Sequence, residues 1–405
     1  MVHSAKQFAS CRCYFQSNIY IPAVRHHFVY KSHDVFKQVY YPIWQRNWAS
    51  AISFEELTFE VQQEIQRRVK LYNSEIKRRA EIAERYRPKW WNILTFQDKW
   101  LSKQFMDLGR QPSDIHRYSL SPGNYLSVIL GWLNVFHIPV WTETFCDMLN
   151  DEISNYQQSG CPQVQPNTMN HNGVVLNEIG FTGHIRELVT THLELIARYV
   201  YPEWIKLNDS GQEGLDSFKA FSIDYGVSNA SSRPGTGSID TKNARLTQDA
   251  DQRMFDVELG MHFDNSEVTI NICLTDSSEY SGSELFICGP CLAGDALCTV
   301  SNLSSAVPPF KHRKGWGFLH IGRQYHGALP ILSGRRRNVI IWMRSSAVRN
   351  QLCPMCQAKP DLVATPCDVD GKYEAICKEI YGDGFTNESC SSNVGADGDS
   401  RCTLG

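Results

Sequence analysis

The first clear hydrophobic pattern in the chain follows residue 50 and has the spacing of a helix. Apolar residues recur every four positions there, at Leu57, Val61, Ile65 and Val69. This spacing places them on one helix face. Ser53 and Glu56 form the capping box typical of a helix start, and Pro88 stops the pattern. The sequence therefore predicts one long helix that begins at Ser53 and ends before Pro88.

Basic residues occupy positions between the apolar residues of this helix. They are Arg67, Arg68, Lys77, Arg78 and Arg79. A basic row of this kind is either a docking surface or, more commonly, the solvated face of a helix. We expect the solvated face.

The neighbouring segments carry weaker patterns. Residues 1–50 are rich in aromatic and β-branched residues, which predict short strands or irregular packing. Residues 88–140 mix tryptophan and tyrosine with turn residues, and we interpret them as a linker that partly packs. A second amphipathic helix starts at Thr142, a suitable N-cap, and continues through Phe145, Leu149 and Ile153.

Strand spacing replaces helix spacing beyond residue 217. Apolar residues alternate with polar ones at Val268, Ile270, Ile272 and Leu274, as in a half-buried strand. Comparable short stretches lie at 218–225, 285–287, 316–320 and 339–342, with glycine and serine turns between them. Short strands of this kind predict a sandwich or jelly roll. The expected fold class is α+β, with this jelly-roll core preceded by a helical N-terminal region.

These changes of pattern divide the 405 residues into four parts. Residues 1–140 form an N-terminal strand and helix region, and 141–215 a helical support of the core. Residues 216–346 form the jelly-roll domain, with a mobile insertion at 228–252 that is either a lid or a neutral surface loop. Residues 347–405 form a cysteine-bearing extension whose end we expect to be disordered.

Composition and charge narrow the classes of protein that the chain represents. It is 42% apolar and 20% charged, as is usual for a globular protein. A formal net charge of −3 argues against nucleic-acid binding, and no apolar run is long enough to span a membrane. The N-terminus lacks the apolar stretch of a signal peptide. We therefore expect an intracellular protein, cytoplasmic or nuclear, whose 14 cysteines are thiols or metal ligands.

The candidate chemistry begins with the sequence His262-Phe263-Asp264. Residues two apart in a strand project from the same face, so His262 and Asp264 converge while Phe263 points away. A second strand would bring His326 to the same point. Two imidazoles and one carboxylate on one face of an octahedron leave three positions open, as in the facial triad of non-haem Fe(II) oxygenases.

Two further features accompany the three candidate ligands. Residues 281–286 (SGSELF) read as a turn that enters a strand, and Arg336 lies ten residues after His326. Arginine is rarely buried without a partner. A dicarboxylic co-substrate would supply one, because the planar guanidinium can bind a carboxylate through two hydrogen bonds.

The segment from His262 to Trp342 resembles the prolyl 4-hydroxylase-like branch of the Fe(II)/2-oxoglutarate-dependent dioxygenases. It shares the order of a His-x-Asp motif, a Gly-x-Glu-Leu strand entry, a distal histidine and a basic residue nine or ten positions later. A closer resemblance to one family of this branch covers most of the chain up to about residue 356. It is carried by CRCYF (11–15), QPNTMNHNGVVLNEIG (165–180), LGMHFDN (259–265), HGALP (326–330) and SSAVRNQLCPMC (345–356).

This resemblance implies a double-stranded β-helix, the jelly roll of these enzymes, with Fe(2+) held by His262, Asp264 and His326. It also implies 2-oxoglutarate as a co-substrate bound by Arg336 and Tyr225, and L-ascorbate (vitamin C) as the reductant. The implied reaction uses O2 to hydroxylate a C–H bond of a protein side chain while 2-oxoglutarate is converted to succinate and CO2. The insertion after Tyr225 departs from the short loop usual in the family.

The resemblance also selects one of three consecutive arginines, 335–337, as the co-substrate ligand. Relatives place a tryptophan six residues after that arginine, which is an even number and therefore the same strand face. Trp342 lies six residues after Arg336. Arg337 shares its face with an apolar row, at Val339, Ile341 and Met343, that we expect to pack outside the barrel. We expect Arg335 and Arg337 to be exposed.

Four other residues could bind a metal or line a polar site, but we expect simpler roles for them. Unbroken alternation puts Thr269 and Asn271 on the face opposite His262, unless a turn near Asn265 resets the register. His312 and His320 are expected to be a loop and a strand residue rather than metal ligands.

Cys353 and Cys356 have the spacing of zinc ligands. Four further cysteines that could contribute are Cys11, Cys13, Cys367 and Cys377. One CxxC pair is compatible with a structural zinc site and with free thiols in a turn, which are the more frequent case.

Three functions remain open at this stage. The first is an active dioxygenase, which the complete set of candidate ligands and Arg336 favour. The second is a non-catalytic jelly-roll protein that binds metal and 2-oxoglutarate. The third is a zinc hydrolase that uses the same two histidines and aspartate, with activity independent of O2 and 2-oxoglutarate.

Overall fold

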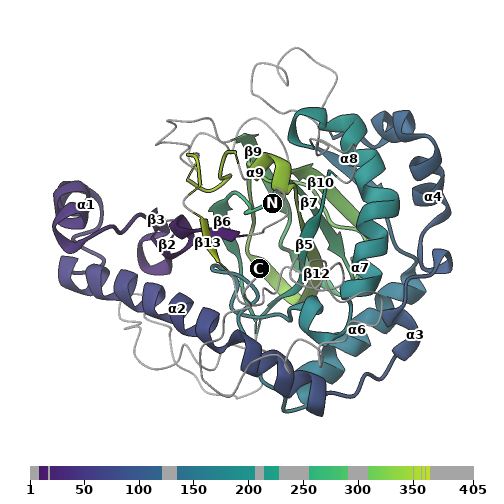
Figure 1. Cartoon of the computed structure of the whole chain (residues 1–405), viewed down its shortest axis with the longest axis horizontal. Helices are drawn as coiled ribbons and strands as arrows, with labels where there is room; N and C mark the ends of the chain where they lie inside the picture. The colour runs from purple at the N-terminus through teal and green to yellow at the C-terminus, as the bar shows by residue number, and fades with distance from the viewer. Residues whose placement is uncertain are drawn as a thin grey trace, which may run out of the picture.

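The computed structural model describes residues 9–16, 19–120, 135–205, 214–227, 255–290, 309–349, 351–356, 358–360 and 362–364. The expected insertion at 228–252, Cys367, Cys377 and the end of the chain lie outside these residues. Helices and antiparallel sheets make up the described chain, so the fold class is α+β, as expected (Figure 1). None of the described helices is both long and apolar enough to cross a membrane.

Two antiparallel sheets form the centre of the molecule. The larger has the order β4–β10–β7–β12–β5, and β8 pairs with β12. Its strands are β4 Phe136–Pro139, β5 Ser217–Gly226, β7 Val268–Cys273, β8 Tyr280–Gly282, β10 Trp316–Ile321 and β12 Ile331–Arg344. The smaller sheet has the order β6–β11–β9. Its strands are β6 Leu259–His262, β9 Leu285–Pro290 and β11 Gln324–Ala328. Every stretch with strand-like alternation in the sequence forms one of these strands.

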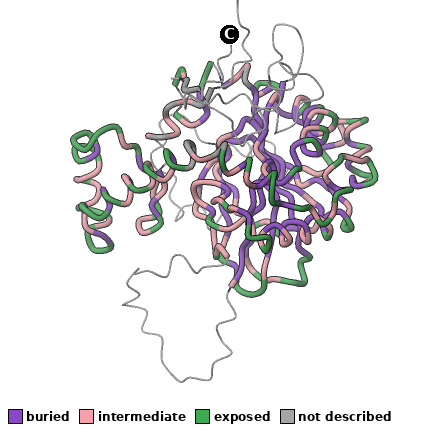
Figure 2. The backbone as a smooth tube through the Cα atoms, turned by 60° about the horizontal axis from the view of Figure 1, so that its bottom comes forward, coloured by how far each residue is buried: buried purple, intermediate pink, exposed green. Residues whose placement is uncertain are grey.

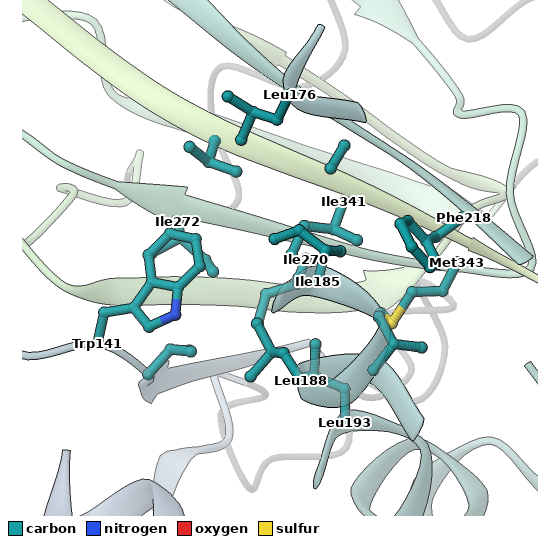
Figure 3. Packing of buried hydrophobic residues seen from close by; sticks show 14 of the residues in the cluster. Trp141, Leu176, Ile185, Leu188, Leu193, Phe218, Ile270, Ile272, Ile341 and Met343 are labelled. Carbon is teal, nitrogen blue, oxygen red and sulfur yellow. The ribbon is translucent and has the colours of Figure 1, made fainter. Parts of the chain in front are cut away.

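Helices lie on both sides of the two sheets (Figure 1). They are α1 His33–Asn47, α2 Phe54–Arg85, α3 Trp91–Leu94, α4 Lys103–Arg110, α6 Glu143–Gln158, α7 Thr182–Leu188, α8 Glu194–Val200 and α9 Ser346–Arg349. The apolar side chains of α7 pack on those of β7 and β12. Figure 3 shows Ile185 and Leu188 against Ile270 and Ile341. This packing buries one whole face of the larger sheet.

The described part of 88–140, which we expect to be a linker that partly packs, contributes to the main core and to the larger sheet. Trp100, Phe105 and Leu108 are buried in the main hydrophobic core, together with side chains of the sheet. β4 forms the edge of the larger sheet beside β10. Its short helical turns pack Trp100 and Phe105 inward, whereas Trp91 is 64% exposed.

The long helix α2 begins as the sequence predicted. The Ser53 hydroxyl accepts a hydrogen bond from the Glu56 amide (3.1 Å), and the Glu56 carboxylate accepts one from the Ser53 amide (3.1 Å). Its apolar face is shorter than predicted. Leu57 and Val61 are buried against the N-terminal strands, whereas Val69 is 41% exposed.

The expectation of a solvated basic face on α2 is wrong for Arg68 and Arg78. Arg68 is buried, pairs with Glu64 (2.9 Å) and donates to the carbonyl of Tyr14 (2.6 Å). Arg78 pairs with Glu178 (2.7 Å), which lies close to the main sheet. Figure 2 shows that the helix leaves the buried centre and carries exposed residues along its length. These arginines therefore attach α2 to the chain segments beneath it.

Two short sheets close the N-terminal part. β2 Ile19–Ile21 pairs with β3 His26–Phe28, and β1 Ala9–Cys11 pairs with β13 Leu362–Ala364. The β2–β3 hairpin lies against β6, because the Tyr20 hydroxyl packs on Gly260 and Arg25 pairs with Glu258. A segment from near the N-terminus therefore lies beside the strand that carries His262.

Arg337 is buried, which corrects the expectation that it would be exposed. Its guanidinium pairs with Asp224 on β5 (2.5 Å) and donates to the Ser154 hydroxyl of α6 (3.0 Å). Burial alone would raise the pKa of Asp224, but the Arg337 charge offsets it, and the net shift is downward. Helices cover the outer face of the sheet, so the buried Arg337 guanidinium is paired with a buried acid. Arg335 is half-exposed and also contacts Asp224 (3.2 Å).

We expect Arg337→Met to lower the free energy of unfolding by about 3–5 kcal/mol, because it leaves a buried carboxylate without its main partner. Urea denaturation measures this, with Arg335→Met as the matched control, for which an exposed pair predicts about 1 kcal/mol or less. Since the folded-state pKa of Asp224 is depressed, the stabilisation is present above the unfolded pKa of about 4 and is lost as the pH falls through the folded pKa. The difference between wild type and variant should therefore shrink below about pH 4. Equal losses of unfolding free energy in Arg337→Met and Arg335→Met would contradict this prediction.

Candidate metal centre

His262 and His326 are direct neighbours across β6 and β11. Their Cα atoms are register partners, and their ring centroids lie 4.3 Å apart. His262 Nδ1 contacts the Gly260 carbonyl (2.8 Å), and His326 Nδ1 contacts the Gln324 carbonyl (2.9 Å). A carbonyl only accepts, so each Nδ1 carries the proton and each Nε2 keeps a free lone pair. His326 lies inside β11, the second strand expected to bring it beside His262.

Burial of the His326 ring lowers its pKa to about 3, so this imidazole is neutral at physiological pH. A neutral ring is the form that binds a metal ion through nitrogen.

Asp264 completes the group from just beyond the end of β6. Its Oδ1 lies 3.6 Å from His262 Nε2, and its Oδ2 lies 3.8 Å from His326 Nε2. The Thr269 hydroxyl donates to Oδ2 (2.7 Å) and orients the carboxylate. Burial would raise the pKa of Asp264, but His326 and His262 lower it, and the net shift is well downward. The carboxylate is therefore anionic.

The three side chains fit a metal ion. Their ligand atoms lie within 4.8 Å of one another, and all three residues are buried. The separations of 3.6 and 3.8 Å exceed a normal hydrogen bond, which leaves both imidazole lone pairs free for a shared cation. Two neutral nitrogens and one carboxylate suit Fe(II) with open positions, and the same donors also occur in zinc sites.

Thr269 and Asn271 face the centre of the molecule, contrary to unbroken alternation from His262. β6 ends at His262 and β7 begins at Val268, so the intervening turn resets the register. Thr269 consequently reaches Asp264, and Asn271 contacts the Asn338 side-chain amide (2.6 Å). The sequence analysis named such a turn as the condition for this outcome.

Arg336 is 1% exposed and is held by neutral groups. Its Nε and Nη2 donate to the Ser283 hydroxyl (3.1 and 2.9 Å), and its Nη1 donates to His312 Nε2 (2.8 Å). Burial, together with the Arg336 charge, lowers the pKa of His312 well below the usual range, so this ring is neutral. Within the described part of the chain, no carboxylate pairs with Arg336. A buried guanidinium without an anion is a site for an anionic ligand.

Tyr225 packs against the buried arginine. It is the cross-strand partner of Arg336, whose guanidinium lies 4.5 Å from the Tyr225 ring centroid. Burial raises the pKa of Tyr225 to about 12, while the charge of Arg336 opposes this rise and that of Asp264 adds to it. The phenol is therefore protonated and lies within electrostatic range of both groups. Asn170, from the QPNTMNHNG segment, contacts its hydroxyl (3.4 Å).

Three residues that contact Arg336 or His326 were either not predicted as site residues or expected to have other roles. Ser283 has a left-handed backbone (φ 61°) and lies after Gly282, so only the turn itself was visible in the sequence. His312 was expected in a loop, and no spacing rule connects it with Arg336. His320 lies in β10, as expected, but its buried ring is 4.7 Å from that of His326. Such contacts depend on strand order rather than on local sequence.

Two histidines and a carboxylate beside a buried, unpaired arginine on a two-sheet core define the class of 2-oxoglutarate- and iron-dependent oxygenases. A family model described as the OGFOD2-like domain matches residues 82–206. Human 2-oxoglutarate and iron-dependent oxygenase domain-containing protein 2 is 32% identical over 397 residues, which cover 96% of each chain. The zebrafish (Danio rerio) protein of the same name is 30% identical, over 95% of this chain and 99% of the relative. The chain therefore belongs to the family of 2-oxoglutarate and iron-dependent oxygenase domain-containing protein 2.

More distant similarities are limited to part of the chain. The Arabidopsis thaliana protein ICU11, also named a 2-oxoglutarate and iron-dependent oxygenase domain-containing protein, is 30% identical over 55% of this chain and 48% of its own length. A solved prolyl-4-hydroxylase from Pseudomonas putida covers 59% of this chain at 11% identity with a TM-score of 0.30, which is too low to bear on fold or function. The resemblance read from the sequence is thus confirmed by the full-length relatives.

Proposed function

We propose that this protein is an active Fe(II)- and 2-oxoglutarate-dependent dioxygenase that hydroxylates a C–H bond and converts 2-oxoglutarate to succinate and CO2. One observation carries the proposal. The buried Arg336 has no carboxylate partner among the described residues, and its guanidinium donates hydrogen bonds to the neutral side chains of Ser283 and His312. A zinc hydrolase would not need an anion-binding arginine at this position.

Each ligand residue has a defined role in this proposal. His262 and His326 offer neutral Nε2 atoms, because backbone carbonyls hold their Nδ1 protons. Asp264 offers the anionic oxygen, and Thr269 fixes its rotamer. Bound Fe(II) would supply the oxygen-dependent redox chemistry, with three positions open for 2-oxoglutarate and O2.

Side chains on the inner face of the larger sheet indicate the length and direction of the space for the co-substrate. Thr269 on β7 contacts Asp264, and Asn271, two residues further on, contacts Asn338, which lies two residues after Arg336 on β12. Two strand residues span about 7 Å, which is comparable with the length of a five-carbon dicarboxylate. Arg336 would bind the distal carboxylate through paired N–H donors, in a desolvated setting that strengthens the interaction.

Tyr225→Phe should weaken 2-oxoglutarate binding about 2- to 12-fold, because a neutral phenol donor contributes roughly 0.5–1.5 kcal/mol. The ring remains in place under Arg336, so the fold and the metal content should not change. Isothermal titration with 2-oxoglutarate under anaerobic conditions measures the effect. Unchanged affinity would remove Tyr225 from the co-substrate site and leave it as a packing residue.

The remaining assignments are supported by family likeness or by the reduced cysteines. We assign L-ascorbate as the reductant and a protein side chain as the substrate because the sequence resembles the prolyl 4-hydroxylase-like branch. An intracellular location, cytoplasmic or nuclear, accords with the free thiols of the described cysteines.

Succinate formation is the direct test. Purified protein with Fe(II), O2 and 2-oxoglutarate should release succinate and CO2 even without a prime substrate, and omission of O2 or iron should abolish the release. Binding of 2-oxoglutarate without succinate would identify the non-catalytic alternative. Hydrolytic activity with Zn(II), independent of O2, would identify the third alternative, a zinc hydrolase. Oxygen-18 incorporation into a protein lysate, followed by mass spectrometry, then identifies the substrate.

A further inference from the structure

Four cysteine sulfurs from opposite ends of the chain meet at one point outside the candidate iron site. Cys11 ends β1, Cys13 lies in the following helical turn Arg12–Phe15, and Cys353 and Cys356 lie in the turn after α9. The four Sγ atoms lie within 4.8 Å of one another. Cys13 and Cys353 are 340 residues apart in sequence, so only the tertiary fold brings them together.

The sulfur separations match a tetrahedral metal site. Cys13 and Cys353 Sγ lie 3.6 Å apart, and Cys11 and Cys356 Sγ lie 4.0 Å apart. Four bonds of about 2.3 Å to a tetrahedral zinc ion place sulfurs about 3.8 Å apart. Disulfides would need about 2.05 Å, and these cysteines are free. One mononuclear ion at the centre therefore fits the spacing better than two disulfides.

The backbone of the CxxC turn also faces the sulfurs with donors. The amides of Met355 and Cys356 hydrogen-bond the Cys353 sulfur, and the amide of Ala358 hydrogen-bonds the Cys356 sulfur. Amide donors directed at sulfur stabilise thiolates, which are the form that binds metal. An ordinary turn with free thiols does not need several amides aimed at its cysteine sulfurs.

Neighbouring contacts hold both pairs in place. The Tyr14 carbonyl, next to Cys13, accepts a hydrogen bond from the buried Arg68 of α2. β1 pairs with β13, which follows the CxxC turn. Arg349, just before that turn, pairs with Glu267 at the start of β7 (3.2 Å). Each half of the cluster is thus attached to a different part of the core.

We propose that Cys11, Cys13, Cys353 and Cys356 bind one structural zinc ion that fastens the two ends of the described chain together. Tetrahedral coordination by four thiolates is typical of structural zinc. The ion closes a loop of more than three hundred residues, since Cys13 and Cys353 are 340 positions apart. It is separate in residues and in chemistry from the iron site, which has no sulfur ligand.

The first experiment measures metal content by inductively coupled plasma mass spectrometry on full-length protein purified under reducing conditions. Wild type should contain one zinc per chain, and Cys353→Ser and Cys13→Ser should retain less than a tenth of it. Cys161→Ser is the matched control, because Cys161 and Cys353 are equally buried at 5% exposure. It should keep the zinc, as should His326→Ala, which alters only the candidate iron site.

X-ray absorption at the zinc edge then identifies the ligands. Four sulfur scatterers at about 2.3 Å support the proposal, whereas nitrogen or oxygen neighbours at about 2.0–2.2 Å place the zinc elsewhere. If Cys353→Ser does not fold, the exposed Cys356→Ser and mercurial titration of wild type replace it. Zinc release in step with the loss of four thiols supports the site. Protein without zinc, with iron in the four-sulfur site, or with zinc that survives loss of these cysteines overturns it.

Discussion

Asp264→Ala should reduce succinate formation from 2-oxoglutarate by more than a hundredfold. Asp264 is the only anionic member of the group, and its two oxygens face both imidazoles at 3.6 and 3.8 Å. Loss of a residue that merely orients a metal ligand typically costs 10–100-fold in metal affinity or activity, so loss of a ligand should exceed that range. Turnover with saturating Fe(II) and iron content after desalting are the two measurements.

A graded series separates this role from a general loss of structure. Thr269→Val keeps the carboxylate but removes the hydroxyl that donates to it (2.7 Å), so its loss should fall within the 10–100-fold range. Asp276→Ala, in the exposed turn after β7, is the control and should retain full activity. The melting temperatures of all three should stay near that of wild type. Near-wild-type turnover of Asp264→Ala would remove it from the metal site while leaving the family assignment intact.

The local parts of this fold could be predicted because their signals lie within a few residues of one another. The Ser53–Glu56 capping box joins groups three residues apart, and both of its hydrogen bonds are present. The alternation at 268–274 reflects a strand whose apolar residues pack in the core while Thr269 and Asn271 face the candidate site. The His-x-Asp motif needed only a strand end to bring His262 and Asp264 together.

The predictions that differ from the structure concern residues whose surroundings depend on a partner far along the chain. Arg337 was expected at the surface, but its partner Asp224 lies 113 positions earlier, on β5. Arg68 was expected on a solvated face, but it binds a carbonyl 54 positions away. Thr269 depended on a turn whose length sets the strand register, which alternation cannot give. Side-chain pairs between distant strands carry no local pattern.

The three consecutive arginines of β12 show how strand geometry assigns different tasks to neighbouring residues. Arg336 points to Ser283, His312 and Tyr225. Arg337 points to the opposite face, where helix α6 and Asp224 bury it. Arg335 is half-exposed, and its guanidinium lies 4.6 Å from the ring centroid of Phe255. Of the three, only Arg336 has no acidic partner among the described residues.

We therefore expect Arg336→Ala to weaken 2-oxoglutarate binding about 30-fold to several thousandfold. Removal of one partner from a desolvated charged pair costs roughly 2–5 kcal/mol, which corresponds to that range of affinity. Arg336→Lys should recover only part of it, because an ammonium ion cannot donate two parallel hydrogen bonds. Anaerobic titration calorimetry on the metal-loaded protein measures the dissociation constants.

Arg335 and Arg337 provide the controls. If the register of β12 is right, their alanine variants should lose different properties. Arg335→Ala should leave both affinity and stability nearly unchanged, since its ion pair is half-exposed. Arg337→Ala should lose stability rather than affinity, because Asp224 is left buried without its main cation. Comparison at a temperature where all variants are folded separates the two effects. A larger loss of affinity in Arg335→Ala or Arg337→Ala than in Arg336→Ala would show that the co-substrate binds on another face of the sheet.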